Sequence, residues 1–437
     1  MYKGFLIGLL ALVSGALVSA KVVSLPQAEQ FVTDRFGTQG SLVWTVTAES
    51  DPADPLLYVF SLGEDRGFCL VAAEDQLPPL LGYTTKGDFD QSDLSVGLHG
   101  LLAAYGQEIQ QVRTAGDGVT DNGWQVAIPV EERLLDTACW GQGYPYNKDT
   151  PTVGGQTTRT GSLSTATGIV LQYYGFPQTQ LMGCTSYRGK SVPWGGFDWR
   201  SMPKVEPVEP LAVDQVGRLL WVLGAYAGVD YGVNETEGSL YRMWQVLRSE
   251  LEFGECNHYV RSVDWAFADW LELIRADIQA SCPVLYEGGA MLARQTVVCD
   301  GYTADGLVHI NWGESGLNNG FYRLSLSDAA WPGDQAMIIG LQPAWPWLDL
   351  IDLHAGVVDS HPVQDLTGAG LEPLSVVSTD NGGVTVAVNQ RERAVITDAS
   401  GRIWYDQFLE VGQHTIPLKG NMYSFYYGAH HYWISIE

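Results

Sequence analysis

The sequence predicts an α+β protein of three successive folded units behind a short N-terminal leader. Three observations carry this prediction: the order of helix-like and strand-like patterns, the turn signals between strands, and a closing run of short alternating strands. The central unit places helices first and antiparallel strands second, which differs from the alternating order of a parallel βαβ sheet. An α+β unit precedes it, and a small β-sandwich follows it.

Composition narrows the classes of function. The 437 residues include 24 Lys plus Arg and 50 Asp plus Glu, a formal net charge of −26, and 46% are hydrophobic. This length fits two or three domains with real cores. An acidic chain disfavours binding to a phosphate backbone, so we expect no nucleic-acid partner. The charge is most simply a solvated exterior.

Residues 1–20 have the pattern of a secretory signal peptide. Lys3 supplies the positive region, an apolar run occupies 5–18, and small residues lead to cleavage after Ala20. The run is shorter than the roughly 20 apolar residues of a transmembrane helix, and no later segment is apolar enough to span a bilayer. We therefore expect a secreted protein with no membrane span.

The first unit, residues 21–118, combines two helical patterns with buried strands. Helices are expected at 28–36 and 98–112, and strands at 57–60 and 67–72. A stretch rich in Gly, Asp and Thr then predicts an exposed linker at 119–130.

The central unit covers residues 131–342. Helices are expected at 162–174, 213–227, 239–251 and 265–281, and strands at 283–287, 296–299, 307–312 and 320–325. Residues 343–437 form a linker and the C-terminal β-sandwich. Its strands are expected at 384–388, 393–397, 403–408, 413–417 and 422–427.

The cysteines do not indicate a metal site. They are Cys69, Cys139, Cys184, Cys256, Cys282 and Cys299. Their wide spacing contains no C-x-x-C pair or zinc pattern. It favours small buried side chains, with a disulfide or two as the open alternative. We expect no metal and no cofactor.

The helix expected at 162–174 begins where a nucleophile could be activated. Residues in a first helical turn lie beside unpaired backbone N–H groups and the positive end of the helix dipole. This environment stabilises a thiolate and supplies an oxyanion donor. The residue at that position is Ser162, and serine is also simply a good residue with which to start a helix.

Several blocks of the central unit resemble the streptopain family of secreted bacterial cysteine peptidases. Residues 140–147 (WGQGYPYN) resemble its W-x-Q-x-x-P-Y-N signature, and 161–166 (GSLSTA) fall where the family has G-C-V-A-T-A. Residues 283–288 (PVLYEG) resemble its substrate-wall strand, and 298–302 (VCDGY) the strand after its catalytic His. Residues 309–313 (HINWG), followed by NGFYRL, resemble its H-V-N-W-G block. The first unit is similar to the family's prodomain.

The resemblance implies a papain-like fold with a helical N-terminal half and an antiparallel C-terminal sheet. It implies that the prodomain packs on the peptidase domain, and that a peptide or protein is the ligand. The family's nucleophilic Cys corresponds to Ser162 and its catalytic His to Gln295, so no catalytic residue is intact. The expected remnants of the substrate pocket are Gln142, Gly161, Arg294, Asn311, Trp312 and Gly313.

Loss of both catalytic groups predicts a secreted pseudopeptidase that binds without cleaving. A serine hydroxyl needs a general base beside it, and the amide of Gln295 has no useful pKa. One alternative is an active endopeptidase that uses Ser162 with another base such as His309, or another nucleophile. A second alternative is a peptidase inhibitor acting through the prodomain. The C-terminal unit is similar to a sorting module of the type IX secretion pathway, with an adhesion module as the other interpretation.

Overall fold

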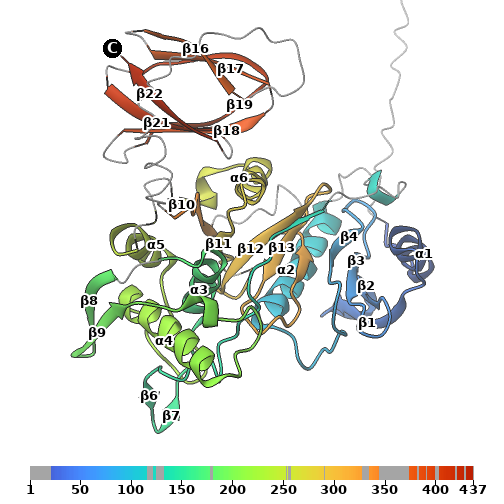
Figure 1. Ribbon diagram of the computed structural model, residues 1–437. Coiled ribbons are helices and arrows are strands. Elements are labelled where there is room, and N and C mark those ends of the chain that lie inside the picture. Colours follow the sequence, from blue (N-terminus) through green and yellow to red (C-terminus); the bar gives the residue numbers. More distant parts are fainter. Residues whose placement is uncertain are drawn as a thin grey trace, which may run out of the picture.

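The structure, a computed structural model, is shown in Figure 1. It describes residues 21–115, 122–124, 132–177, 181–251, 253, 257–289, 291–326, 334–343, 374–380, 383–389, 391–398, 403–418, 421–427 and 430–436. The predicted signal peptide, most of the predicted linker at 119–130, and Cys256 lie outside these residues. Within the described ranges, no helix is long and apolar enough to cross a bilayer.

The first unit is a four-stranded antiparallel sheet with a helix at each end of its sequence. Its elements are α1 (Leu25–Phe36), β1 (Ser41–Ala48), β2 (Asp51–Ser61), β3 (Phe68–Ala72), β4 (Leu80–Tyr83) and α2 (Val96–Ala115). Helix α1 begins at a capping box, in which Gln27 Oε1 accepts a hydrogen bond from Ser24 N at 3.0 Å. It ends at Gly37, whose φ of 65° suits glycine.

The central unit begins with β5 (Glu132–Leu134) and ends with β15 (Ala336–Ile339). Its helices are α3 (Ser162–Tyr174), α4 (Pro210–Ala227), α5 (Leu240–Ser249) and α6 (Phe267–Gln279). Two hairpins lie on its surface, β6 (Thr152–Val153) with β7 (Gln156–Thr157), and β8 (Leu181–Tyr187) with β9 (Lys190–Gly195). Its other strands are β10 (His258–Arg261), β11 (Val284–Glu287), β12 (Thr296–Thr303), β13 (Val308–Asn311) and β14 (Gly320–Tyr322).

A single antiparallel sheet of 11 strands runs through both units. Its order is β1-β2-β3-β4-β14-β13-β12-β11-β15-β10, and β5 pairs with β12. The junction lies between β4 and β14, where Phe321 pairs with Tyr83 and Tyr322 with Gly82. In Figure 1 the blue strands of the first unit therefore continue the orange strands of the central unit. The two units are thus joined by backbone hydrogen bonds as well as by packing.

The central strands are buried on both faces, because helices cover each side. Val284 and Tyr286 belong to the hydrophobic core with α2 and α6, whereas Leu285 belongs to the core with α3, α4 and α5. This alternation explains the consecutive apolar residues Val284, Leu285 and Tyr286 in β11 and Val297, Val298 and Cys299 in β12. The first core combines residues of both units, so the first unit packs on the central unit.

Polar side chains of α2 also bind the central unit. The hydroxyl of Tyr105, which is fully buried, donates to Leu81 O at 3.0 Å and to Arg323 O at 2.6 Å. The buried carboxylate of Glu108 accepts from Leu326 N at 2.8 Å. These bonds satisfy groups that water cannot reach, so separating the two units would leave them unpaired.

The C-terminal unit contains two antiparallel sheets. Strands β16 (Leu374–Asp380), β17 (Gly383–Val388) and β20 (Gly412–Ile416) form one sheet. Strands β18 (Glu392–Asp398), β19 (Ile403–Leu409), β21 (Asn421–Tyr427) and β22 (His430–Ile436) form the other. Arg391 contacts α6 through ion pairs of 3.8 Å with both Asp269 and Glu272. The β-sandwich therefore lies against α6 (Figure 1).

Candidate active site

The site is built on the N-terminus of α3. Gly161 is the N-cap residue, with φ of 85°, and a Cβ at this position would lie 3.0 Å from Thr236 O. Both facts require glycine. Ser162 is the first residue of the helix and is 9% exposed. Its side chain therefore lies beside the unpaired N–H groups of the first helical turn, as the sequence predicts.

Strand β12 brings position 295 to the same place. The backbone N–H of Thr296 donates to Ser162 Oγ at 3.1 Å. Because Gln295 directly precedes Thr296, the two positions to which the resemblance assigns the family's nucleophile and base are neighbours in space. The Ser162 hydroxyl oxygen is an acceptor that ties α3 to β12. The side-chain amide of Gln295 makes no hydrogen bond within the part of the chain that the structure describes.

The turn before Gln295 has a backbone suited to glycine. Ala293 and Arg294 have φ of 51° and 58°. Both values lie in the left-handed region, which costs a non-glycine residue free energy. Glycine would adopt this conformation without that cost. The Arg294 side chain is exposed, and its charge favours ionisation of Glu287 on the neighbouring strand.

The other side of the helix N-terminus is formed by two loops. Gln142 O accepts from Thr160 N at 3.1 Å, which holds the loop of Gln142 against the start of α3. Gly313 has φ of 67°, and a Cβ there would lie 3.2 Å from Thr165 Cγ2. The structure thus gathers Gln142, Gly161, Ser162 and Gly313 around one helix end.

The side chains of Asn311 and Trp312 serve the packing and hydrogen bonding of the fold. Asn311 Nδ2 donates to Ala138 O at 2.9 Å, and Asn311 Oδ1 accepts from Gly313 N at 3.2 Å. Trp312 is 2% exposed, and a Cβ on Gly97 of α2 would overlap its ring. The first unit therefore covers the indole that the resemblance assigns to the substrate pocket.

His309 is not placed to serve Ser162. It pairs with Gly301, five positions along β12 from Thr296, which corresponds to about 16 Å. Its Nδ1 contacts Asp300 Oδ1 at 2.5 Å. His258 lies on β10, opposite Ile339, at the far edge of the sheet. Neither histidine is a base for this site.

Among the five cysteines that the structure describes, none is placed at the N-terminus of α3. Cys69, Cys139, Cys184, Cys282 and Cys299 are free, so these five form no disulfide with one another. Burial raises the pKa of Cys139 and of Cys299, which disfavours the reactive thiolate. In the described ranges no group of three or more His, Cys, Asp or Glu side chains could hold a metal ion.

One acidic residue near the site was not singled out from the sequence. Glu287 pairs with Thr296 across β11 and β12. Burial raises the pKa of its carboxyl, and the backbone of Leu240 at the start of α5 opposes this shift. Glu287 belongs to the 283–288 block that resembles the substrate-wall strand, but only strand pairing places it opposite Thr296, whose N–H binds Ser162.

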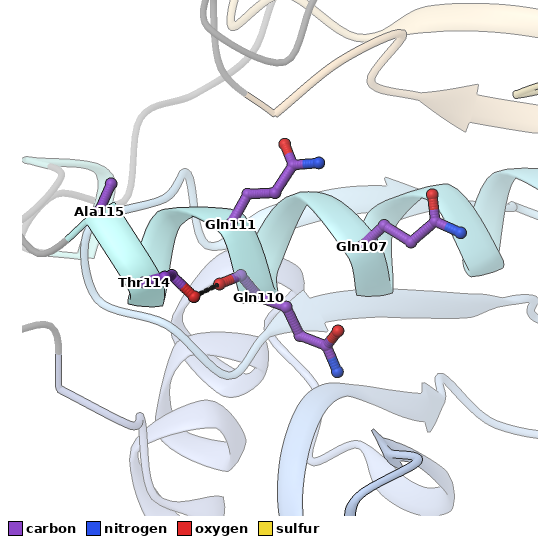
Figure 2. A pocket seen from close by; sticks show the side chains of 5 residues that line it. All are labelled: Gln107, Gln110, Gln111, Thr114 and Ala115. Carbon is purple, nitrogen blue, oxygen red and sulfur yellow. Dashed lines mark hydrogen bonds between the residues drawn. The ribbon is translucent and has the colours of Figure 1, made fainter.

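A separate depression lies on α2, and none of the site residues described above lines it. Its volume is about 570 Å³. Figure 2 shows the residues that line it, Gln107, Gln110, Gln111, Thr114 and Ala115. Thr114 Oγ1 donates to Gln110 O at 2.8 Å, so its hydroxyl serves the helix. The predicted site residues do not line this depression, and its side chains carry no nucleophile or titratable group.

Comparison with known proteins finds two matching sequence families. Residues 140–322 match the sequence family described as the Peptidase C10 family, and residues 25–109 match the family described as the Spi protease inhibitor. The chain is a homologue of the streptopain-type cysteine peptidases. The first unit of this streptopain homologue corresponds to the prodomain, and the central unit contains the peptidase-like part.

The relatives are bacterial proteins. The thiol protease/hemagglutinin PrtT of Porphyromonas gingivalis is 28% identical over 374 residues, which cover 75% of this chain but only 43% of PrtT. Streptopain of Streptococcus pyogenes is 24% identical over 327 residues, covering 66% of this chain and 81% of streptopain. A solved fragment of prointerpain A from Prevotella intermedia matches with a TM-score of 0.58 and 23% identity, covering 70% of this chain and 100% of the fragment. This last match shows the common fold.

Proposed function

We propose that this streptopain homologue is an exported pseudopeptidase that binds peptide or protein partners without cleaving them. The observation that carries the proposal is the state of Ser162. Its hydroxyl oxygen accepts from Thr296 N, and Gln295 occupies the position of the base. A serine becomes a nucleophile only when an adjacent group takes its proton, and a glutamine amide cannot do so.

The surroundings of the lost residues support binding. Gly161 and Gly313 keep the close backbone approaches around α3, and Gln142 stays beside the helix N-terminus. We assign residues 21–118 to the prodomain, 131–342 to the peptidase-like domain and 343–437 to a linker with a sorting or adhesion module. We further propose that residues 1–20 direct export to the bacterial exterior, with cleavage after Ala20.

The experiment compares the full natural chain with Ser162→Ala and with the double variant Ser162→Cys, Gln295→His. The substrates are unfolded casein and 4-nitrophenyl acetate, whose acetyl group is small enough for a side chain that is 9% exposed. We expect the natural chain and Ser162→Ala to be equally inactive, and the double variant to hydrolyse the ester. Hydrolysis by the natural chain that Ser162→Ala abolishes would contradict the proposal.

A second candidate function is an active serine peptidase with Glu287 as its base. The observation in its favour is a carboxyl beside Thr296 whose pKa is raised by burial, since a higher pKa makes a better base. Against it, no hydrogen bond joins Glu287 and Ser162, and the Ser162 hydroxyl oxygen instead accepts from Thr296 N. The matched variant is Glu287→Gln, which should abolish any activity of the natural chain if this mechanism operates.

Inhibition by the prodomain is a third candidate, and the match of residues 25–109 to the Spi protease inhibitor supports it. The prodomain is bound to its own peptidase-like domain through β4 and β14. We therefore expect the full chain not to inhibit an active streptopain added to it. Inhibition that rises with the concentration of the full chain would favour this function instead.

A further inference from the structure

Three polar side chains meet beside the N-terminus of α3. Gln142 Nε2 donates to Glu314 Oε1 at 2.8 Å. Arg159 Nη2 donates to both carboxylate oxygens of Glu314, each at 3.0 Å. Gln142 is 5% exposed, and the Glu314 side chain is 20% exposed. The amide of Gln142 is therefore held by a carboxylate that is itself held by a guanidinium.

This cluster adjoins the position of the nucleophile. Arg159 lies three residues before Ser162, and the carbonyl oxygens of Gly141 and Gln142 accept from Thr165 Oγ1 and Thr160 N. Glu314 directly follows Gly313, which packs against Thr165. The Gln142 amide thus belongs to a loop that is held against the first turn of α3, where helix backbone N–H groups lack intrahelical partners.

That placement has a consequence for acyl-transfer chemistry. Attack on a carbonyl develops negative charge on oxygen, and side-chain amides together with helix N–H groups stabilise it when they point at that oxygen. A donor already bound to a carboxylate must first break that charge-assisted bond. Burial raises the pKa of the Glu314 carboxyl, whereas the adjacent Arg159 guanidinium opposes that shift and favours the ionised form.

We propose that Glu314 is a positioning residue that keeps the Gln142 amide engaged and so closes the oxyanion site of this chain. This block is independent of the substitutions at positions 162 and 295. The inference rests on the proposed function. It adds a third obstacle to catalysis, the engaged Gln142 amide, to the missing nucleophile and the missing base. Restoring those two groups alone should therefore leave the acylation step slow.

The test uses the full chain carrying Ser162→Cys and Gln295→His, with and without Glu314→Ala. The readout is the rate constant of the 4-nitrophenolate burst from 4-nitrophenyl acetate. Since one oxyanion donor is worth about 10²–10³ in rate, we expect Glu314→Ala to accelerate acylation by about a hundredfold. The matched control is Glu314→Gln, whose amide oxygen still accepts from Gln142 and should give little gain.

The decisive comparison is Gln142→Ala in both backgrounds. With Glu314 present it should change the burst rate little, because the amide is already engaged. With Glu314→Ala it should remove the whole gain. A gain that persists without Gln142, or no gain from Glu314→Ala, would overturn the inference. If Glu314→Ala does not fold, Arg159→Met removes the group that anchors Glu314 and should give a smaller gain with the same dependence on Gln142.

Alkylation of the introduced thiol by iodoacetamide separates the two proposals, because this reaction develops no oxyanion. Suppose that the introduced thiol is alkylated fast and that Glu314→Ala leaves the burst rate unchanged. This result would refute the role of Glu314 and leave the pseudopeptidase proposal standing. Turnover by the natural chain, lost in Ser162→Ala, would refute the pseudopeptidase proposal instead.

Discussion

The contact between α2 and the central unit predicts both the direction and the size of the change in the free energy of unfolding for two Gly→Ala substitutions. A Cβ on Gly97 would overlap the Trp312 ring, which is buried and cannot move outward. A Cβ on Gly106 of the same helix would lie 3.4 Å from Leu56 Cδ1, an ordinary contact. The same substitution, Gly→Ala, should therefore have opposite effects at two positions of one helix.

The magnitudes follow from two opposing effects. Alanine is favoured over glycine in a helix interior by about 0.8–1 kcal/mol, so Gly106→Ala should raise the free energy of unfolding by up to that amount. Overpacking a close-packed core costs about 1–3 kcal/mol. At Gly97, the second residue of α2, the gain from helix propensity is small, so Gly97→Ala should lower the free energy of unfolding by about 1–3 kcal/mol.

The assay is urea denaturation of the full chain, followed both by tryptophan fluorescence and by far-ultraviolet circular dichroism. Because the prodomain and peptidase-like domain share a sheet and a core, we expect the two signals to give the same midpoint for this part of the molecule. A Gly97→Ala variant as stable as Gly106→Ala would refute the close contact between α2 and Trp312.

Three further predictions concern the site and the C-terminal unit. Gly161→Ala should lower the free energy of unfolding by more than about 1 kcal/mol, measured by the same denaturation, because φ is 85° and Thr236 blocks the added methyl group. Burial raises the pKa of Glu287 above its ordinary 4.5. The protonated carboxyl therefore contributes fully to the free energy of unfolding below pH 4.5, and this contribution is lost as the pH rises through the folded-state pKa. Between pH 4 and pH 7, the free energy of unfolding of Glu287→Gln should therefore fall less than that of the natural chain. Equal slopes of the free energy of unfolding against pH for the two proteins would contradict this. Arg391→Ala should change the free energy of unfolding by less than about 1 kcal/mol, because its ion pairs are partly exposed, and a greater loss by calorimetry would show that this residue chiefly holds the sandwich.

Local patterns in the sequence were sufficient for the main helices and for the α+β class. The helix expected at 162–174 is found there as α3, because its apolar positions recur with helical spacing and Gly175 ends it in a left-handed conformation. Strands such as β4 and β15 escaped prediction. Both are short, and each pairs with strands far away in the sequence, β14 for β4, and β10 and β11 for β15. The resemblance to streptopain identified the family and named Ser162 and Gln295, which the comparisons with known proteins support at the level of the family.

The sequence by itself determined which groups are present for chemistry: a serine at position 162 and a glutamine at position 295, where the resemblance expects a thiol and an imidazole. Only the tertiary structure decided how those groups are used. The bond from Thr296 to Ser162 joins residues 134 positions apart, that from Gln142 to Glu314 spans 172, and that from Leu326 to Glu108 spans 218. Such contacts have no local signal, because they depend on which strands pair and which faces pack, and those choices are made by the whole chain at once.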